Sequence, residues 1–363
     1  MLSKLDESLV HQAPVPFRMA SVTDHRFFDR YWFEALDPSG EIALITGLAF
    51  YKNMDMCDGF FSVQKNQKQY NLRLSRPLAD NLDSSSGPLS VEIIEPFRNI
   101  RLRLDSNEHG MMADLEWNAR FPAYEEDFHR TISGRRISTE STRYDQVGTW
   151  TGWIEVEGER YTVNNWFGVR DHSWGVRPGV GGFEPPSISG RSSLLFCWAC
   201  FATDDYTCQF QLQEDGEGKR LYFDGQLDYP LDDDRPSVRA VDVTHDISFV
   251  PGTRIYDRLN YSLKLDNGDL LDIEAKPLFR AWAYSGTGYD GGFHDRLGLG
   301  GARGESMEYD IYDLSHVNDV LLDGKTHFPG HREQPASATV NGAPAIGHMP
   351  VMTAGPIARY KLT

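Results

Sequence analysis

The chain has little that would build helices or membrane spans. After residue 12, apolar residues hardly ever recur at the three- and four-residue spacing of an amphipathic helix. There is no run of about 18 apolar residues, so a membrane-spanning helix is not expected. Strand and helix patterns do not alternate either, which argues against the α/β folds that bind nucleotides. An all-β protein is the remaining interpretation.

Cysteine is scarce, with only four in 363 residues. Cys197 and Cys200 have the spacing of a redox or zinc pair, but the apolar segment around them indicates a buried strand, on which residues three apart face opposite sides. A zinc site also needs a second pair, so we interpret both cysteines as structural. Reduced thiols, together with an N-terminus that lacks the apolar core of a signal peptide, predict a cytoplasmic protein.

Basic residues are outnumbered, 36 Lys and Arg against 53 Asp and Glu, and the formal net charge is -17. Such a surface repels phosphate backbones and anionic lipid headgroups, so neither nucleic acid nor a membrane is an expected partner. The sequence leaves the oligomeric state open, with a homodimer as one alternative.

Cofactor and metal motifs are incomplete. Residues 286–291 match Gly-x-Gly-x-x-Gly, but no helix pattern follows, as a dinucleotide site would require. His327 and His331 are four apart, yet Pro329 and Gly330 between them prevent the helix that would bring both to one face. We therefore expect neither a metal nor an organic cofactor.

Strand signals are abundant instead. Apolar and polar residues alternate over 100–104 and again over 111–117, which predicts a hairpin with one solvated face. Asn267 and Gly268 lie between two further alternating runs, a strong hairpin signal. Aromatic residues make up 12% of the chain, which suits sheets around a ligand cavity.

A glycine- and proline-rich stretch from Pro178 to Pro186 interrupts this pattern near the middle of the chain. Such composition suits a connection between two β-domains, which we predict at residues 1–180 and 187–363. Pockets favour domain interfaces, so a pocket near this connection is expected. Whether residues 323–350 cover that pocket is left open.

Ionisable and aromatic side chains are most concentrated just before this glycine- and proline-rich stretch, from Asn164 to Arg177. Asp171 and His172 are candidates for proton transfer, because histidine titrates near neutrality and a shielded carboxylate has a raised pKa. On a strand, however, Arg170, His172 and Trp174 would share one face while Asp171 and Ser173 would share the other. The alternative is a buried polar network in which Asp171 pairs with an arginine.

Residues 168–177 resemble the Gly-x-Arg-Asp-His-Ser-Trp-Gly-x-Arg signature of bacterial proteins related to hydroxyneurosporene synthase, the carotenoid hydratase, and to the AttH-like group. Residues 298–305 are similar to a glycine-rich segment of the second domain of such proteins. The resemblance implies two tandem lipocalin-like antiparallel β-barrel or sandwich domains with an apolar pocket near their interface. It also implies hydrophobic substrates, no cofactor, and acid–base catalysis, which carries over onto Asp171 and His172.

We therefore expect a cofactor-independent lyase or isomerase acting on a hydrophobic or aromatic small molecule, such as an isoprenoid, polyene or steroid, by hydration, dehydration, elimination or cyclisation. The expected catalytic residues are Asp171, His172 and Glu305. The expected substrate-binding residues are Arg170, Arg177, Trp166, Trp174, Trp198, Trp282 and Tyr284. The alternative is a non-catalytic carrier of a lipid or isoprenoid; a titratable group inside the cavity would favour the enzyme.

Overall fold

The computed structural model describes residues 2, 4–183 and 193–363, and its regular structure is almost all β-strand, which confirms the all-β prediction. The predicted connection from Pro178 to Pro186 lies partly outside the described residues. The helices of the described part are short 3-10 turns: η1 (Lys4–Glu7), η2 (Lys52–Met54), η3 (Tyr284–Thr287), η4 (Tyr289–Gly291) and η5 (Ala358–Tyr360). Within these ranges, none has the length and apolarity needed to cross a bilayer.

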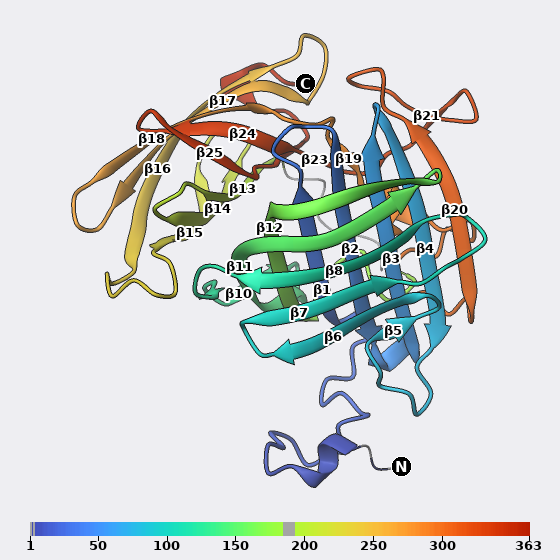
Figure 1. Cartoon of the computed structure of the whole chain (residues 1–363). Coiled ribbons are helices and arrows are strands. Elements are labelled where there is room, and N and C mark those ends of the chain that lie inside the picture. Colours follow the sequence, from blue (N-terminus) through green and yellow to red (C-terminus); the bar gives the residue numbers. More distant parts are fainter. Residues whose placement is uncertain (1, 3, 184–192) are drawn as a thin grey trace.

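The first sheet has 15 strands and folds back on itself, because β6 to β8, β11 and β12 cross over β1 to β4 (Figure 1). In spatial order its strands are β22 (Lys325–His327), β21 (Val320–Leu322), β20 (Ser306–Asp313), β4 (Lys68–Pro77), β3 (Met56–Lys65), β2 (Ile42–Tyr51), β1 (Phe27–Leu36), β12 (Glu159–Val176), β11 (Arg136–Val156), β8 (Met112–Ala119), β7 (Asn99–Leu104), β6 (Leu89–Glu95) and β5 (Ser85–Ser86), with β9 (Tyr124–Glu125) and β10 (His129–Ser133) paired to β11.

The second sheet closes into an antiparallel barrel, because β13 pairs with β14 on one side and with β25 and β26 on the other. Its strands are β14 (Thr207–Asp215), β15 (Arg220–Asp228), β16 (Val238–Phe249), β17 (Tyr256–Leu265), β18 (Leu270–Pro277), β24 (Pro335–Val340), β25 (Ala343–His348), β13 (Leu194–Ala202) and β26 (Val351–Ala354). A separate pair, β19 (Trp282–Ala283) with β23 (Arg332–Glu333), lies in the segment that returns to the first sheet.

The chain passes between the two sheets more than once. Strands β20 to β22 come from the C-terminal half, yet β20 pairs with β4 along its whole length and so extends the first sheet. The glycine-rich residues between β19 and β20 pack on the end of β1 and β2, where Leu299 lies in one apolar cluster with Phe28 and Tyr51. The division at residues 180–187 stays a prediction.

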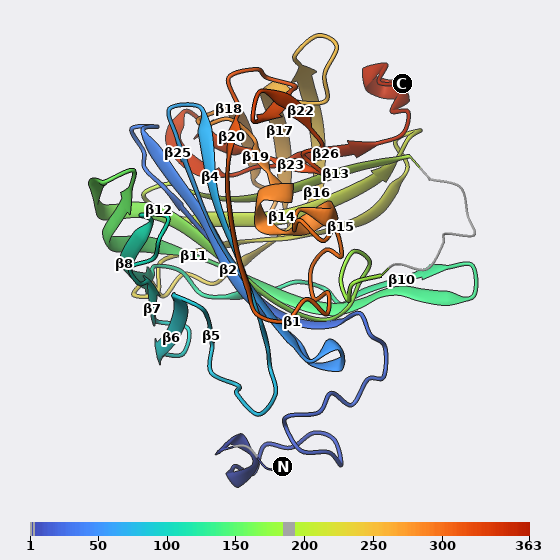
Figure 2. The same ribbon diagram turned by 90° about the vertical axis from the view of Figure 1, so that its right-hand side faces the viewer.

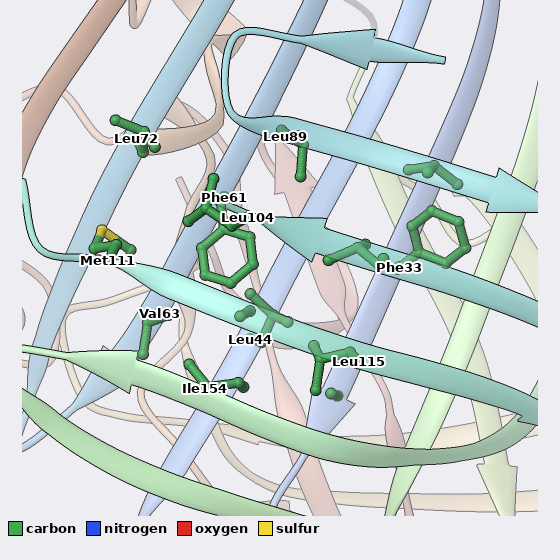
Figure 3. Packing of buried hydrophobic residues seen from close by; sticks show 14 of the residues in the cluster. Phe33, Leu44, Phe61, Val63, Leu72, Leu89, Leu104, Met111, Leu115 and Ile154 are labelled. Atoms are coloured by element: carbon green, nitrogen blue, oxygen red, sulfur yellow. The ribbon is translucent and has the colours of Figure 1, made fainter. Parts of the chain in front are cut away.

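The core of the first sheet lies where its two layers face each other (Figure 3). Leu44, Phe61 and Leu72 from β2 to β4 point toward Leu104 and Leu115 from β7 and β8. Strands β7 and β8 form the hairpin predicted from the alternation at 100–104 and 111–117, with their apolar residues buried.

The barrel has a core of its own, and β13 shows how its two faces divide. Cys197 packs inside the barrel, whereas Cys200 belongs to a cluster between the two sheets. All four cysteines are buried and free, as the structural interpretation predicts. The intersheet cluster also contains Trp32, Trp198 and Trp282, so aromatic side chains join the barrel to the first sheet. Figure 2 shows the backbone of the two sheets from the side.

Leu115 and Leu270 offer a matched test of this core. Leu115 is 1% exposed, so Leu115→Ala should lower the free energy of unfolding by about 3 kcal/mol through lost burial and a new cavity. Leu270 is 56% exposed, so Leu270→Ala should change it by less than about 0.5 kcal/mol. Urea denaturation followed by tryptophan fluorescence measures both; equal effects would contradict the assigned core.

Candidate functional site

A cavity of about 500 Å³ lies between the two sheets, within the usual size range of small-molecule sites. The first sheet contributes Phe28, Arg30, Trp32, Arg143, Asp171 and Ser173. The barrel contributes Leu194, Phe196, Trp198, Gln211 and Met352. The connecting segments add Arg177, Tyr284, Tyr289, His331 and Glu333, the last two from the 323–350 segment.

Strand alternation decides which side chains reach this cavity. On β1, Arg30 and Trp32 face the cavity, while Tyr31 packs with the core of the first sheet. On β12, which pairs with β1, Asp171 lies opposite Trp32 and Ser173 lies opposite Arg30. Side chains directly opposite each other on paired strands share a face, so the four form one continuous patch of the cavity wall.

Tyr289 interacts with two arginines, Arg30 and Arg177, at this wall of the cavity. Its phenol oxygen accepts a hydrogen bond from Arg30 Nη1 and another from Arg177 Nη2, the latter at 2.7 Å. Burial raises the pKa of Tyr289, but the two guanidinium charges outweigh it and leave the pKa below its ordinary value. A phenolate at this position is therefore easier to form than in water.

A chain of buried carboxylates and imidazoles begins at His331 and runs into the intersheet core. His331 contacts Asp290 at 3.3 Å and Glu333 at 3.5 Å. Glu333 contacts His348 Nε2 at 3.0 Å, and Nδ1 of the same ring lies 3.0 Å from a carboxylate oxygen of Glu34. The network thus links the cavity to β1.

These contacts keep both histidines protonated. Burial lowers the pKa of His331, but hydrogen bonds to Asp290 and Glu333 outweigh it and raise the pKa to about 9. Burial acts in the same direction on His348, whereas Glu34 and Glu333 raise its pKa to about 10. His331 is therefore a cationic acid on the cavity wall at neutral pH.

Asp171 belongs to a second charged cluster. Its carboxylate accepts a hydrogen bond from Ser173 at 3.0 Å and lies 3.5 Å from Arg143. Arg143 also pairs with Glu126 at 2.5 Å. Burial raises the pKa of Asp171, and the charges of Arg143 and Arg30 offset this only in part. Asp171 therefore shows features of both interpretations made from the sequence: an arginine partner and access to the cavity.

Four of the residues selected from the sequence line the cavity: Asp171, Arg177, Trp198 and Tyr284. Trp282 lies behind the wall, fully buried, and donates a hydrogen bond to Glu34 at 2.9 Å.

The other selected residues do not line the cavity. His172 faces the opposite side of β12, where it contacts Asp29 at 2.8 Å and Tyr144 at 3.2 Å and lines a separate pocket of about 90 Å³. The remaining four are Arg170, bonded to Gln146; Trp166, in the core of the first sheet; Trp174, beside His172; and Glu305, on the exposed surface. The expected division of the motif between two faces is confirmed.

Several residues of the site were missed by sequence reasoning. Arg30 and Glu34 are charged positions four apart in the strand 27–36, which is apolar apart from these two and Asp29, and this pattern is visible in the sequence. His348 lies near the C-terminus and Glu34 near the N-terminus, and no local sequence pattern connects the two. Tyr289 lies in a glycine-rich loop whose sequence matches an incomplete dinucleotide motif and carries no pattern for an acid–base residue.

Across residues 2, 4–183 and 193–363, no group of three or more His, Cys, Asp or Glu side chains is placed to hold a metal ion. The imidazoles of the network instead contact carboxylates. The arrangement suits proton transfer between side chains and a bound molecule.

The network should make stability pH-dependent. Because the folded pKa values of His331 and His348 lie above the unfolded value of about 6.5, their stabilisation is complete below that pH and is lost as the pH rises through about 9 and 10. The free energy of unfolding should fall over this window, by up to about 1.4 kcal/mol per pH unit for each retained proton. His331→Gln should flatten the slope seen in urea titrations, whereas exposed His316→Gln should leave it unchanged.

Removing the charge of Glu333 should be costly for the fold. Glu333→Gln leaves two protonated histidines with fewer counter-charges and should lower the free energy of unfolding by about 3 kcal/mol at pH 7. Glu305→Gln, at an exposed position, is the control and should be neutral. Thermal or urea denaturation compares them, and a fully stable Glu333→Gln protein would contradict the network.

Comparison with known structures supports the fold predicted from the motif. A protein from Nitrosomonas europaea provisionally called AttH is similar over 95% of this chain and 98% of its own, with a TM-score of 0.52 and 12% identity. CghA is similar over 92% and 89%, with a TM-score of 0.50 and 8% identity. Kievitone hydratase from Nectria haematococca gives a TM-score of 0.46 at 11% identity over 89% and 87%. At these identities the first two establish a likeness of fold alone.

No curated protein matches the sequence at a significant level. Residues 2–358, by contrast, match the profile of a family of unknown function, DUF8625. The match spans nearly the whole chain, and the protein belongs to this family.

Proposed function

We propose that the protein is a cofactor-independent enzyme that carries out lyase or isomerase chemistry on an apolar small molecule bound between the two sheets. The observation that carries this proposal is the wall of the cavity, where Tyr289, His331 and Asp171 lie among aromatic side chains. Groups that gain and lose protons inside an apolar cavity are the feature that separates an enzyme from a carrier.

Tyr289 is the base in this proposal. Arg30 and Arg177 hold its oxygen and favour the phenolate, so it can accept a proton from a carbon atom of the substrate. The two arginines also fix the direction of the oxygen, which positions the base before the substrate arrives.

His331 is the acid. Its ring lies beside that of Tyr289, with 5.0 Å between centroids, and its raised pKa keeps it protonated at neutral pH. In an elimination, Tyr289 takes the proton from carbon, the carbon–oxygen bond breaks as the double bond forms, and His331 protonates the leaving hydroxyl to give water. The reverse sequence is hydration. Asp171, on the β12 side of the cavity, is a second proton donor, because burial of its carboxyl group favours the neutral form.

The other walls suit an apolar skeleton. Phe28, Trp32, Phe196, Trp198 and Met352 line the cavity and would bury the hydrophobic part of the molecule. These same walls would serve the alternative function, a lipid or isoprenoid carrier. A carrier has no use for an ionised acid–base pair in its pocket, and this favours the enzyme. A cytoplasmic location and a homodimer stay predictions.

The test starts with native mass spectrometry of the protein purified from its own cells, followed by incubation of any released compound with fresh protein. We expect conversion by the wild type, and a decrease of about 100-fold or more in Tyr289→Phe, which keeps the ring but removes the proton acceptor. His172→Gln, on the opposite face of β12, is the matched control and should retain turnover. A compound returned unchanged by the wild type would favour the carrier.

A further inference from the structure

We propose that the molecule bound in the cavity carries an oxyanion, a carboxylate or an enolate oxygen on its apolar skeleton, and that Arg30 and Arg177 bind this oxyanion. The inference names the substrate class of the proposed enzyme and so rests on that function for turnover. The binding itself can be tested without turnover.

The first argument is a missing counter-charge. Within the described residues, no carboxylate lies within 4.0 Å of the guanidinium of Arg30 or Arg177, although Arg30 is only 4% exposed. Other buried arginines are paired: Arg73 with Asp310 at 2.8 Å, and Arg303 with Asp58 at 3.1 Å. Asp171 attracts Arg30 only from beyond ion-pair distance, and its own ion-pair partner is Arg143 at 3.5 Å. Burying a cation without a direct ion pair is costly, and a bound anion would offset that cost.

The second argument is the set of unused donors. Arg30 Nη2 and Arg177 Nε are buried and have no hydrogen-bond partner among the described residues. Their side chains line the cavity. The one polar group that both arginines share is the Tyr289 oxygen, which uses a single nitrogen of each. Donor capacity is left over on both guanidinium groups, and planar guanidinium edges match the two oxygens of a carboxylate.

The surroundings hold these donors in place. Arg177 stacks over Phe28 with 4.7 Å between its guanidinium carbon and the ring centroid, and Arg30 lies over Phe60 at 5.4 Å. Aromatic faces orient a guanidinium plane and leave its edge for hydrogen bonding. They also keep the local dielectric low, which strengthens attraction for an anion.

The charges balance when an oxyanion is present. Two guanidinium groups meet one tyrosine oxygen, so even an ionised Tyr289 neutralises only one of them. Asp171, the carboxyl group of the same cavity that attracts Arg30, is already paired with Arg143, so the second guanidinium charge is offset only in part. A bound oxyanion would complete the neutralisation. An oxyanion here would lie next to the base, so the carbon that loses its proton would be adjacent to the carboxylate or to the enolisable carbonyl.

Matched pairs of small aromatic probes test the inference by isothermal titration calorimetry at neutral pH. The first pair is 2-naphthoate and 2-naphthamide, whose difference in affinity measures a preference for a carboxylate. The second pair is 4-hydroxycoumarin, which is an ionised enol at neutral pH, and its neutral methyl ether; their difference in affinity measures a preference for an enolate. We expect the anion to bind about tenfold or more tightly in at least one pair, and the pair that responds identifies the source of the oxyanion.

Arg177→Met and Arg30→Met should each remove most of this preference while leaving the neutral probes bound through the apolar walls. Arg160→Met, exposed on the first sheet, is the control and should keep it. Circular dichroism checks folding, and the half-buried Arg177 supplies the test if the Arg30 variant does not fold.

Equal affinity within both pairs, no binding of any probe, or a preference that survives both arginine substitutions would overturn the inference. None of these results bears on turnover. Conversely, if the wild type returns its compound unchanged while the anion preference persists, the proposed function fails and the oxyanion site stands. If Tyr289→Phe converts substrate normally, the assignment of Tyr289 as the base fails and the oxyanion site again stands.

Discussion

The contact on which the site depends is the ion pair between Glu34 and His348, buried at the junction of the two sheets. Glu34 comes from β1 of the first sheet, His348 comes from the end of β25 in the barrel, and both are fully buried. Trp32 and Trp198 pack on the imidazole, each with 5.0 Å between ring centroids, and Trp282 donates a hydrogen bond to Glu34. Charges buried this deeply tolerate only a narrow geometry, because each must keep its partner. The pair therefore fixes the position of the barrel against β1, and with it the distance between the two walls of the cavity.

The position of Glu333 extends this constraint into the cavity. Glu333 contacts His348 on its inner side and His331 on its outer side, so the charge state of the junction and that of the cavity wall are coupled. The loop that carries Tyr289 is attached to the same network through Asp290 and His331. Structure and proposed chemistry thus depend on one set of side chains, which explains why so many ionisable groups are kept in the interior despite the cost of burying them.

The sequence predicts the fold class well, because strand alternation is a local property. The hairpin at residues 99–119 follows from a period-two pattern, and the strand that holds Cys197 and Cys200 follows from a continuous apolar segment. The same reasoning separates Asp171 from His172, since adjacent strand residues face opposite sides. Asp171 and Ser173 of the 168–177 motif therefore line the cavity. His172 instead contacts Asp29 and Tyr144 on the opposite face of the strand.

What the sequence does not reveal are contacts between distant segments. Glu34, Tyr289 and His348 join one network only when the barrel packs on the first sheet. The sequence around each residue does not indicate which distant residues it will contact. The addition of β20 to the edge of β4 is equally non-local, since it is decided by which strand edge is free. Tyr289 carries the least sequence signal and the largest role in the account. Its titration, measured as the tyrosinate absorbance of the wild type minus that of Tyr289→Phe, tests that role directly. We predict that Tyr289 ionises below the ordinary pKa of about 10; ionisation at or above that value would contradict its role as the base.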